Sequence, residues 1–180
     1  MPDLSSNSKK FLLKTARQSI ENHFKDVILH ESAAEPDDLR AHFGCFVTLR
    51  KNRILRGCVG TFEASRSLLD NVKRMSVAAA FQDRRFPPVE KNEIPDIQLE
   101  ISVLGNLEKI QVLDEIELGR HGVYVKLGDK TGTFLPDVAL EQRWNVVEFV
   151  TYCAREKAGL LPEECARAEV FRYPVDKISE

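Results

Sequence analysis

The stretch Leu55-Arg56-Gly57-Cys58-Val59-Gly60 places an arginine, a thiol and two glycines inside a segment that otherwise has the character of a β-strand. Glycine weakens a strand, so two of them indicate a bulge or a close approach by a ligand or another backbone. Regular alternation along the strand puts Arg56 and Cys58 on the same face. A guanidinium beside a thiol favours the thiolate, which is the reactive form. Cys58 is therefore either an activated nucleophile or a buried structural cysteine.

This stretch lies in the second strand of a predicted hairpin. Residues 44–50 alternate as the first strand, Lys51-Asn52 forms the turn, and residues 53–62 run back. A helix capped by Ser67 and a strand over residues 97–103 follow.

The second half repeats the order of hairpin, helix and strand. Its expected elements are strands at 122–127 and 131–135, a helix capped by Asn145, and a last strand at 169–173. An amphipathic helix, for which Ser8 is a plausible N-cap, precedes both repeats. Strands mixed with helices, without βαβ alternation, predict an α+β fold with a mainly antiparallel sheet. We expect a single domain over residues 1–180, with lobes at 1–110 and 111–180 and any cleft between them.

Composition and charge narrow the classes of function. The 180 residues are 43% hydrophobic and 30% charged, as is typical of soluble globular proteins, and the net charge is -2. That charge gives no electrostatic reason for non-specific binding to nucleic acid or to an anionic membrane. The four cysteines form no CxxC pair, so the spacing predicts neither a metal site nor a cofactor. A polar start and no long apolar run predict a cytoplasmic protein without a membrane span.

Several blocks resemble those of one known family. Leu55 to Thr61 resembles the LRGCIGT signature of the AMMECR domain family, whose bacterial and archaeal members are called AmmeMemoRadiSam system protein A. Five further blocks follow in order, and they resemble AAxxDxRFxP at 78–88, EISVL at 100–104, GxxGV at 119–123, LPQVAxExxW at 135–144 and KAGL at 157–160. The departures are Val59 for isoleucine and Asp137 for glutamine.

The resemblance has implications for fold and partners. It implies two similar repeats, each of hairpin, helix and strand, around one barrel-like sheet with flanking helices. The system name implies an association with a Memo-type protein and a radical SAM enzyme. It implies no established reaction.

One hypothesis is an enzyme whose nucleophile is Cys58. Arg56 would lower the pKa of the thiol or hold an anionic group of a small ligand. Gly57 and Gly60 would let the ligand reach backbone N–H groups. His121 is the candidate base by residue type, although a histidine before a strand is more often a solvated loop residue.

Three charged residues are further candidates for ligand binding. Asp83 and Arg85 either line the cleft, with Arg85 binding a carboxylate or phosphate, or form a salt bridge that fixes the loop after the helix. Glu100 either faces solvent or pairs with Arg56 or Arg85.

The alternative hypothesis is a non-catalytic adaptor that presents a substrate to the implied partners. The sequence contains no metal site, phosphate-binding loop or dinucleotide fingerprint, which favours this alternative. A lesser alternative is an RNA-linked role through a patch of basic residues on the hairpin and after the helix. The simpler interpretation of these residues is a solvated hairpin tip.

Overall fold

The computed structural model describes residues 4–25 and 35–180, which divide into two compact units. Of the described residues, unit 1 comprises 4–25, 35–104 and 176–180, and unit 2 comprises 105–175. The single domain with lobes at 1–110 and 111–180 stays a prediction. The last residues return to unit 1 because the final strand continues beyond unit 2 and adjoins a strand of unit 1.

Unit 1 is built on three antiparallel strands. β1 (Cys45–Lys51) lies between β2 (Ile54–Thr61) and β3 (Ile97–Leu104), so β2 is an edge strand. The register aligns Val59 with Val47 and Ile101 on one face, and Cys58 with Thr48 and Glu100 on the other. The hairpin and the strand at 97–103 are therefore confirmed, but the turn lies at Asn52-Arg53 rather than at Lys51-Asn52, because Lys51 still pairs with Ile54 in the ladder.

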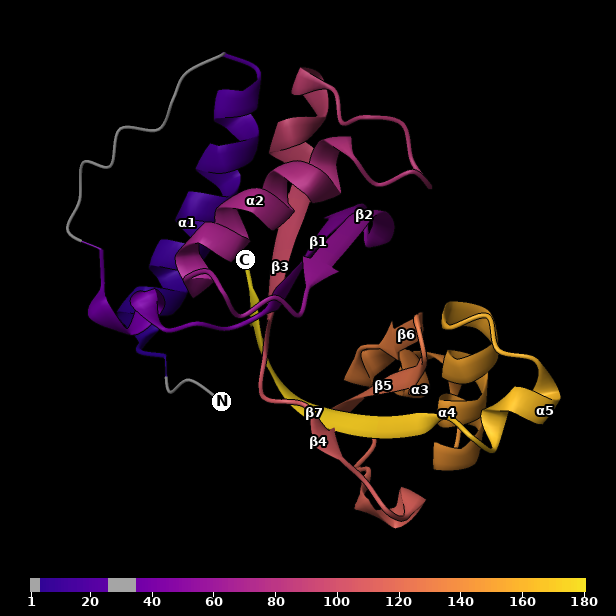
Figure 1. Ribbon diagram of the computed structural model, residues 1–180. Coiled ribbons are helices and arrows are strands. Elements are labelled where there is room, and N and C mark those ends of the chain that lie inside the picture. Colours follow the sequence, from indigo (N-terminus) through magenta and orange to yellow (C-terminus); the bar gives the residue numbers. More distant parts are fainter. Residues whose placement is uncertain (1–3, 26–34) are drawn as a thin grey trace. The chain divides into compact units, whose positions relative to one another are not determined.

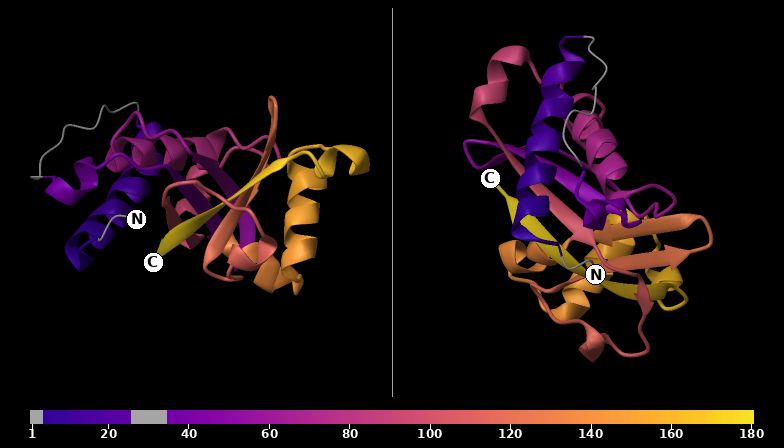
Figure 2. Two further views of the ribbon diagram at one scale, coloured as in Figure 1. Left: turned by 60° about the horizontal axis from the view of Figure 1, so that its bottom comes forward. Right: turned by 90° about the vertical axis from the view of Figure 1, so that its left-hand side faces the viewer.

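Two helices cover the apolar face of this sheet (Figures 1 and 2). α1 (Ser6–His23) is capped by Ser5 rather than by the expected Ser8, whose side chain instead donates to Asp38. α2 (Leu68–Phe81) begins at the predicted cap, because Ser67 Oγ accepts from the Asp70 N–H at 3.1 Å. Unit 1 also contains the short 3₁₀ helices Asp37–Arg40 and Lys91–Asp96.

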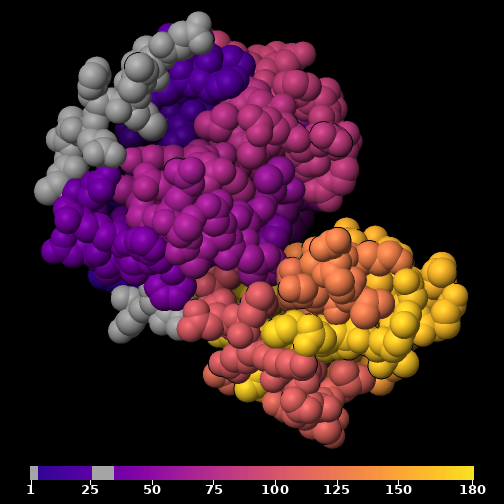
Figure 3. Space-filling model, in the orientation of Figure 1, coloured from indigo at the N-terminus to yellow at the C-terminus, as the bar shows by residue number. Residues whose placement is uncertain are grey.

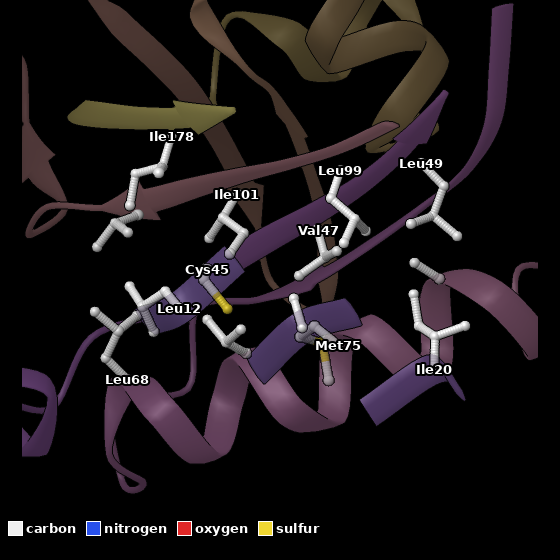
Figure 4. Packing of buried hydrophobic residues seen from close by; sticks show 14 of the residues in the cluster. Leu12, Ile20, Cys45, Val47, Leu49, Leu68, Met75, Leu99, Ile101 and Ile178 are labelled. Carbon is white, nitrogen blue, oxygen red and sulfur yellow. The ribbon is translucent and has the colours of Figure 1, made fainter. Parts of the chain in front are cut away.

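The core of unit 1 fills the space between the sheet and the helices. Figure 4 shows Val47, Leu49 and Ile101 pointing from the sheet toward Leu12 and Met75 of the helices. Burying such side chains contributes roughly 1.5–3 kcal/mol each, so this face holds the helices on the sheet.

Unit 2 has its own sheet and its own core. β5 (His121–Leu127) lies between β6 (Lys130–Phe134) and β7 (Glu169–Ser179), and β4 (Glu108–Lys109) pairs with β7. The helical elements are the 3₁₀ turn Leu113–Glu115, α3 (Pro136–Gln142), α4 (Val146–Tyr152), the π-helical segment Cys153–Lys157 and α5 (Pro162–Cys165). Phe149 is fully buried and belongs to the apolar cluster of this unit.

The predicted fold class is confirmed: the chain is α+β, its paired strands are antiparallel, and helices flank the sheet. One strand order, β2-β1-β3-β7-β5-β6, runs through both units because β7 belongs to each of them. Within the described residues, no helix is long and apolar enough to cross a membrane.

Candidate functional site

Cys58 lies on the edge strand, on the face of the sheet away from the helices. Its thiol is half-buried and accepts a hydrogen bond from Thr48 Oγ1 at 3.3 Å. Burial raises the pKa of the Cys58 thiol, and the bond from Thr48 and the charge of Arg85 oppose that rise. The net direction is upward, so the thiol form is favoured near neutral pH.

Asp83 and Arg85 occupy the open edge of β2 beside Cys58. The Cys58 N–H donates to Asp83 Oδ2 at 2.8 Å, and Arg85 Nη2 donates to the Cys58 carbonyl at 3.1 Å. The two side chains also form a bidentate ion pair with distances of 2.9 and 2.7 Å. Together they satisfy the backbone groups that a neighbouring strand would otherwise bond.

This arrangement matches the salt-bridge alternative for Asp83 and Arg85. Hydrogen bonds from Arg85, followed by those from the Cys58 and Arg85 N–H groups, lower the pKa of Asp83 to about 2 despite the opposing effect of burial. The Arg85 guanidinium, although half-exposed, is engaged with Asp83 and with the strand.

Arg56 does not lie beside the Cys58 thiol, contrary to the alternation expected for a regular strand. The register shifts after Leu49, which pairs with Gly57, whereas Arg50 pairs with Leu55. Arg56 is the extra residue of this β-bulge, and a bulge redirects its side chain. Arg56 pairs with Glu93 at 2.8 Å. The positive charge that lowers the pKa of the Cys58 thiol is therefore that of Arg85 and not, as expected, that of Arg56.

Arg56 instead holds the loop of residues 84–92, which we call the display loop. Its guanidinium donates to the carbonyl oxygens of Pro87 and Pro88 at 2.8 and 3.2 Å and to both oxygens of Glu93. Hydrogen bonds from Arg56, then from the Glu90 N–H and from Lys51, lower the pKa of Glu93 to about 2. Arg56 and Glu93 are 14% and 15% exposed, so this pair is largely shielded from water.

The two glycines of the motif face other parts of the protein rather than an open cleft. A Cβ on Gly57 would lie 2.1 Å from the Ala79 carbonyl oxygen of α2. A Cβ on Gly60 would lie 2.2 Å from the ring of Phe46. Their missing side chains therefore permit close packing of α2 and of an aromatic ring.

Glu100 lies in the same cross-strand row as Thr48 and Cys58. It forms a salt bridge with Lys177 at 3.2 Å rather than with Arg56 or Arg85.

The sequence did not indicate three of the partners at this site, which are Thr48, Lys177 and Glu93. Each of them meets its partner only through a strand pairing or a distant loop. A single threonine hydroxyl in the first strand of the hairpin carries no distinctive signal of its own.

His121 belongs to unit 2, where it begins β5. Its Nδ1 accepts a hydrogen bond from the Glu117 N–H at 3.0 Å. Burial, followed by the charges of Arg172 and Arg120, lowers the pKa of His121, so the imidazole is neutral at pH 7. The unprotonated ring nitrogen of the neutral imidazole, Nδ1, therefore holds the turn that precedes β5.

The display loop lies at the surface of unit 1, beyond the C-terminal end of α2 (Figures 1 and 3). An open pocket of about 400 Å³ lies beside it, between Lys51 and Arg56 on the hairpin and Pro87, Pro88 and Asn92 on the loop. Glu90 and Glu93 also line this pocket, so its charges balance. In the described ranges, no cluster of three histidine, cysteine or acidic side chains is placed to hold a metal ion.

The sequence profile of the family described as AMMECR1 matches residues 13–178. A protein of Methanothermobacter thermautotrophicus is 38% identical over 183 residues, covering 94% of this chain and 93% of its own length. A Methanopyrus kandleri protein is 34% identical over 169 residues, covering 89% and 81%. The crystal structure of an uncharacterized Pyrococcus horikoshii protein, 29% identical, superposes with a TM-score of 0.91 and covers 98% of this chain and 93% of its own.

Proposed function

This chain belongs to the AMMECR1 family, and on that premise we propose that it is a non-catalytic adaptor that presents the display loop, residues 84–92, to a protein partner. The partners that the sequence resemblance implies are a Memo-type protein and a radical SAM enzyme. A rigid exposed loop on a folded scaffold is a common form of protein recognition element.

The fastening of the display loop to β2 is the observation that carries this proposal. Arg56 holds the loop through two carbonyl oxygens and Glu93, and Asp83 with Arg85 holds its start to Cys58. Two of the motif blocks, at 55–61 and 78–88, thus meet to position an exposed segment. Pre-ordering a loop lowers the entropy cost of binding by about 0.5–1.5 kcal/mol for each immobilised side chain.

The charges at the site favour an adaptor over an anion-binding enzyme. Both arginines that were expected to hold an anion have carboxylate partners at 2.7–2.8 Å. The pKa of the Cys58 thiol is raised, mainly by burial, which disfavours a thiolate nucleophile. The same pairing neutralises part of the basic patch on which an RNA-linked role would depend.

Charge reversal on the display loop tests the proposal. Arg84 and Lys91 are exposed, and neither belongs to an ion pair with another described residue. We expect Arg84→Glu with Lys91→Glu to weaken binding to the purified Memo-type or radical SAM protein at least about tenfold, as loss of complementary rim charges and introduction of repulsion do. Lys14→Glu with Lys10→Glu on α1 is the matched control.

Binding is measured by surface plasmon resonance against each purified partner. The expected result is a loss for the loop variant and wild-type affinity for the α1 variant. Equal affinities for the loop variant and the wild type, or no binding by either partner to the wild type, would overturn the adaptor proposal.

A second candidate, nucleophilic catalysis by Cys58, is favoured by the hydrogen bond from Thr48 and the nearby positive charge of Arg85, which both lower the pKa. It requires a substantial thiolate fraction near neutral pH. Alkylation of Cys58 followed by peptide mapping, as a function of pH, separates the candidates. A midpoint well below the free-thiol value of about 8.5 supports a nucleophile, whereas a midpoint above it supports the adaptor.

A further inference from the structure

A second pocket, of about 430 Å³, lies in unit 2, which the proposed function does not use. It is formed where α4, the π-helical segment and the start of α5 meet (Figure 1). Tyr152, Leu160, Leu161 and Pro162 supply apolar walls, and Leu161 is 55% exposed. Arg155 and Glu156 supply adjacent charges of opposite sign.

The backbone around this pocket is locally unusual and firmly positioned. The Ala158 N–H donates to the Cys153 carbonyl at 3.1 Å, which widens the helix by one residue, and Gly159 then adopts a positive φ of 66°. A Cβ on Gly132 of β6 would lie 2.4 Å from the Ala158 nitrogen, so the segment packs directly on the strand. Single π turns are frequent at functional sites.

The rim of the pocket is also held in place. Lys130 of β6 bonds both carboxylate oxygens of Glu164 at 2.8 and 2.9 Å. Glu164 in turn accepts the Leu161 N–H at 2.8 Å and so fixes the start of α5. The apolar wall is therefore positioned before any ligand arrives.

The charged side chains of the π-helical segment differ in whether they have an interaction partner within the protein. Lys157 lies over the ring of Phe134 at 5.2 Å, a cation–π contact, and does not line the pocket. Arg155 and Glu156 line it, and neither side chain has a salt bridge or hydrogen bond to another residue in the described part of the chain. Two charges without partners beside a preformed apolar wall provide the groups needed to bind a zwitterion with an apolar side chain.

We propose that this pocket binds a small α-amino acid with a bulky apolar side chain. Arg155 would pair with its carboxylate, Glu156 with its ammonium group, and Tyr152, Leu160 and Leu161 would cover its side chain. The site lies wholly within unit 2 and does not depend on the adaptor role of the display loop.

The chain carries its own reporter for this site. Trp144 is its single tryptophan, and its ring stacks on Tyr152 with centroids 4.5 Å apart. A ligand that contacts the Tyr152 ring changes the surroundings of this stacked pair. Tryptophan fluorescence of the full chain, excited at wavelengths that tyrosine and phenylalanine do not absorb, therefore reports occupancy.

The test is a titration with L-phenylalanine, 3-phenylpropionate and 2-phenylethylamine. The last two compounds lack the ammonium group and the carboxylate, respectively. We expect saturable binding of L-phenylalanine with a Kd on the order of 1 mM, as suits a ligand of this size, and at least about tenfold weaker binding of the other two, because each leaves one charge unpaired. Absence of saturation with L-phenylalanine, or equal affinity for 3-phenylpropionate, would overturn the proposal.

Substitutions then locate the binding site. We expect Arg155→Ala to weaken L-phenylalanine binding at least about tenfold, and Glu156→Gln to abolish the preference over 3-phenylpropionate. Arg167→Ala, an exposed arginine outside the pocket, is the matched control. Thermal unfolding of each variant confirms folding, and unchanged affinity in a folded Arg155→Ala variant would contradict the assignment.

Discussion

The carboxylate of Asp83 joins two parts of unit 1 through a charge-assisted network. It accepts the Cys58 N–H at 2.8 Å and the Arg85 guanidinium at 2.7 Å, and its side chain is only 7% exposed. Hydrogen bonds to charged groups are worth about 1.5–3 kcal/mol when they are shielded from water. Asp83 therefore stabilises the edge strand and the start of the display loop together.

We expect Asp83→Asn to lower the free energy of unfolding by about 2 kcal/mol at pH 7, because the amide cannot accept from both the guanidinium and the backbone with the same strength. Urea denaturation at neutral pH measures this change. Asp129→Asn, at an exposed turn, is the control and should leave stability unchanged within about 0.5 kcal/mol. An equal effect of the two substitutions would exclude a stabilising role for the Asp83 network.

The cysteines should differ in their reactivity toward alkylation in the native state. Burial raises the pKa of Cys45 and Cys153 to about 12, and both thiols are buried. Cys58 and Cys165 are half-buried. We therefore expect iodoacetamide to label Cys58 and Cys165 before Cys45 and Cys153, and time-resolved peptide mapping to show that order. Labelling of Cys153 before Cys165 would contradict the packing of unit 2.

At the scale of elements, the β1–β2 hairpin turns through two residues in left-handed conformation. Asn52 has φ 52° and Arg53 has φ 66°. Asparagine tolerates this region, but a long side chain such as arginine adopts it at a cost of about 1 kcal/mol. The turn that forms the hairpin is thus mildly strained at one residue.

Arg53→Gly should relieve that strain and raise the free energy of unfolding by about 0.5–1 kcal/mol. The gain is measured as a shift of the urea midpoint without a change in m-value. Arg53→Ala is the comparison, since alanine removes the same charge and retains the unfavourable φ. Equal stability of the two variants would show that charge rather than backbone strain decides the effect.

The contact between α2 and β2 depends on Gly57. A methyl group there would lie 2.1 Å from the Ala79 carbonyl oxygen, a backbone atom that cannot move independently of the helix. We expect Gly57→Ala to lower the free energy of unfolding by about 3 kcal/mol or more. The control is Ala64→Gly in the exposed loop before α2, and chemical denaturation of both variants checks the difference. A loss under about 1 kcal/mol would mean that α2 shifts without cost.

At the scale of the whole molecule, two carboxylates of unit 1 connect stability to pH. The pKa values of Asp83 and Glu93 are both lowered to about 2, chiefly by hydrogen bonds from Arg85 and Arg56. Because these values lie below those of an unfolded chain, the unfolded state binds protons first as the pH falls. The stabilisation is complete above about pH 5 and is lost progressively toward pH 2.

We expect the free energy of unfolding to fall by roughly 2 kcal/mol for each of these two groups between pH 5 and pH 2. The double variant Asp83→Asn with Glu93→Gln should be less stable at pH 7 and should lose less stability over that range. Guanidinium denaturation at a series of pH values measures both slopes. Parallel slopes for the variant and the wild type would assign the acid sensitivity to other groups.

The local elements and the family could be predicted from the sequence, because they depend on near neighbours along the chain. The strand at 97–103, the cap at Ser67 and the capping box of Asn145 with Glu148 are patterns that span a few residues, and the structure confirms each of them, although Ser102, on the polar side of the strand's alternation, is buried. The ordered motif blocks identified the family for the same reason, since each is a short continuous string.

The tertiary structure alone decided how the side chains of the candidate site are used. The bulge that turns Arg56 toward Glu93 arises in the pairing of β1 with β2, and the environment of Cys58 depends on Asp83 and Arg85, about 25 residues away. The π turn beside the unit 2 pocket likewise packs directly on Gly132 of a separate strand. Contacts between distant segments form only when the chain folds, so the short-range patterns that define helices and strands do not encode them individually.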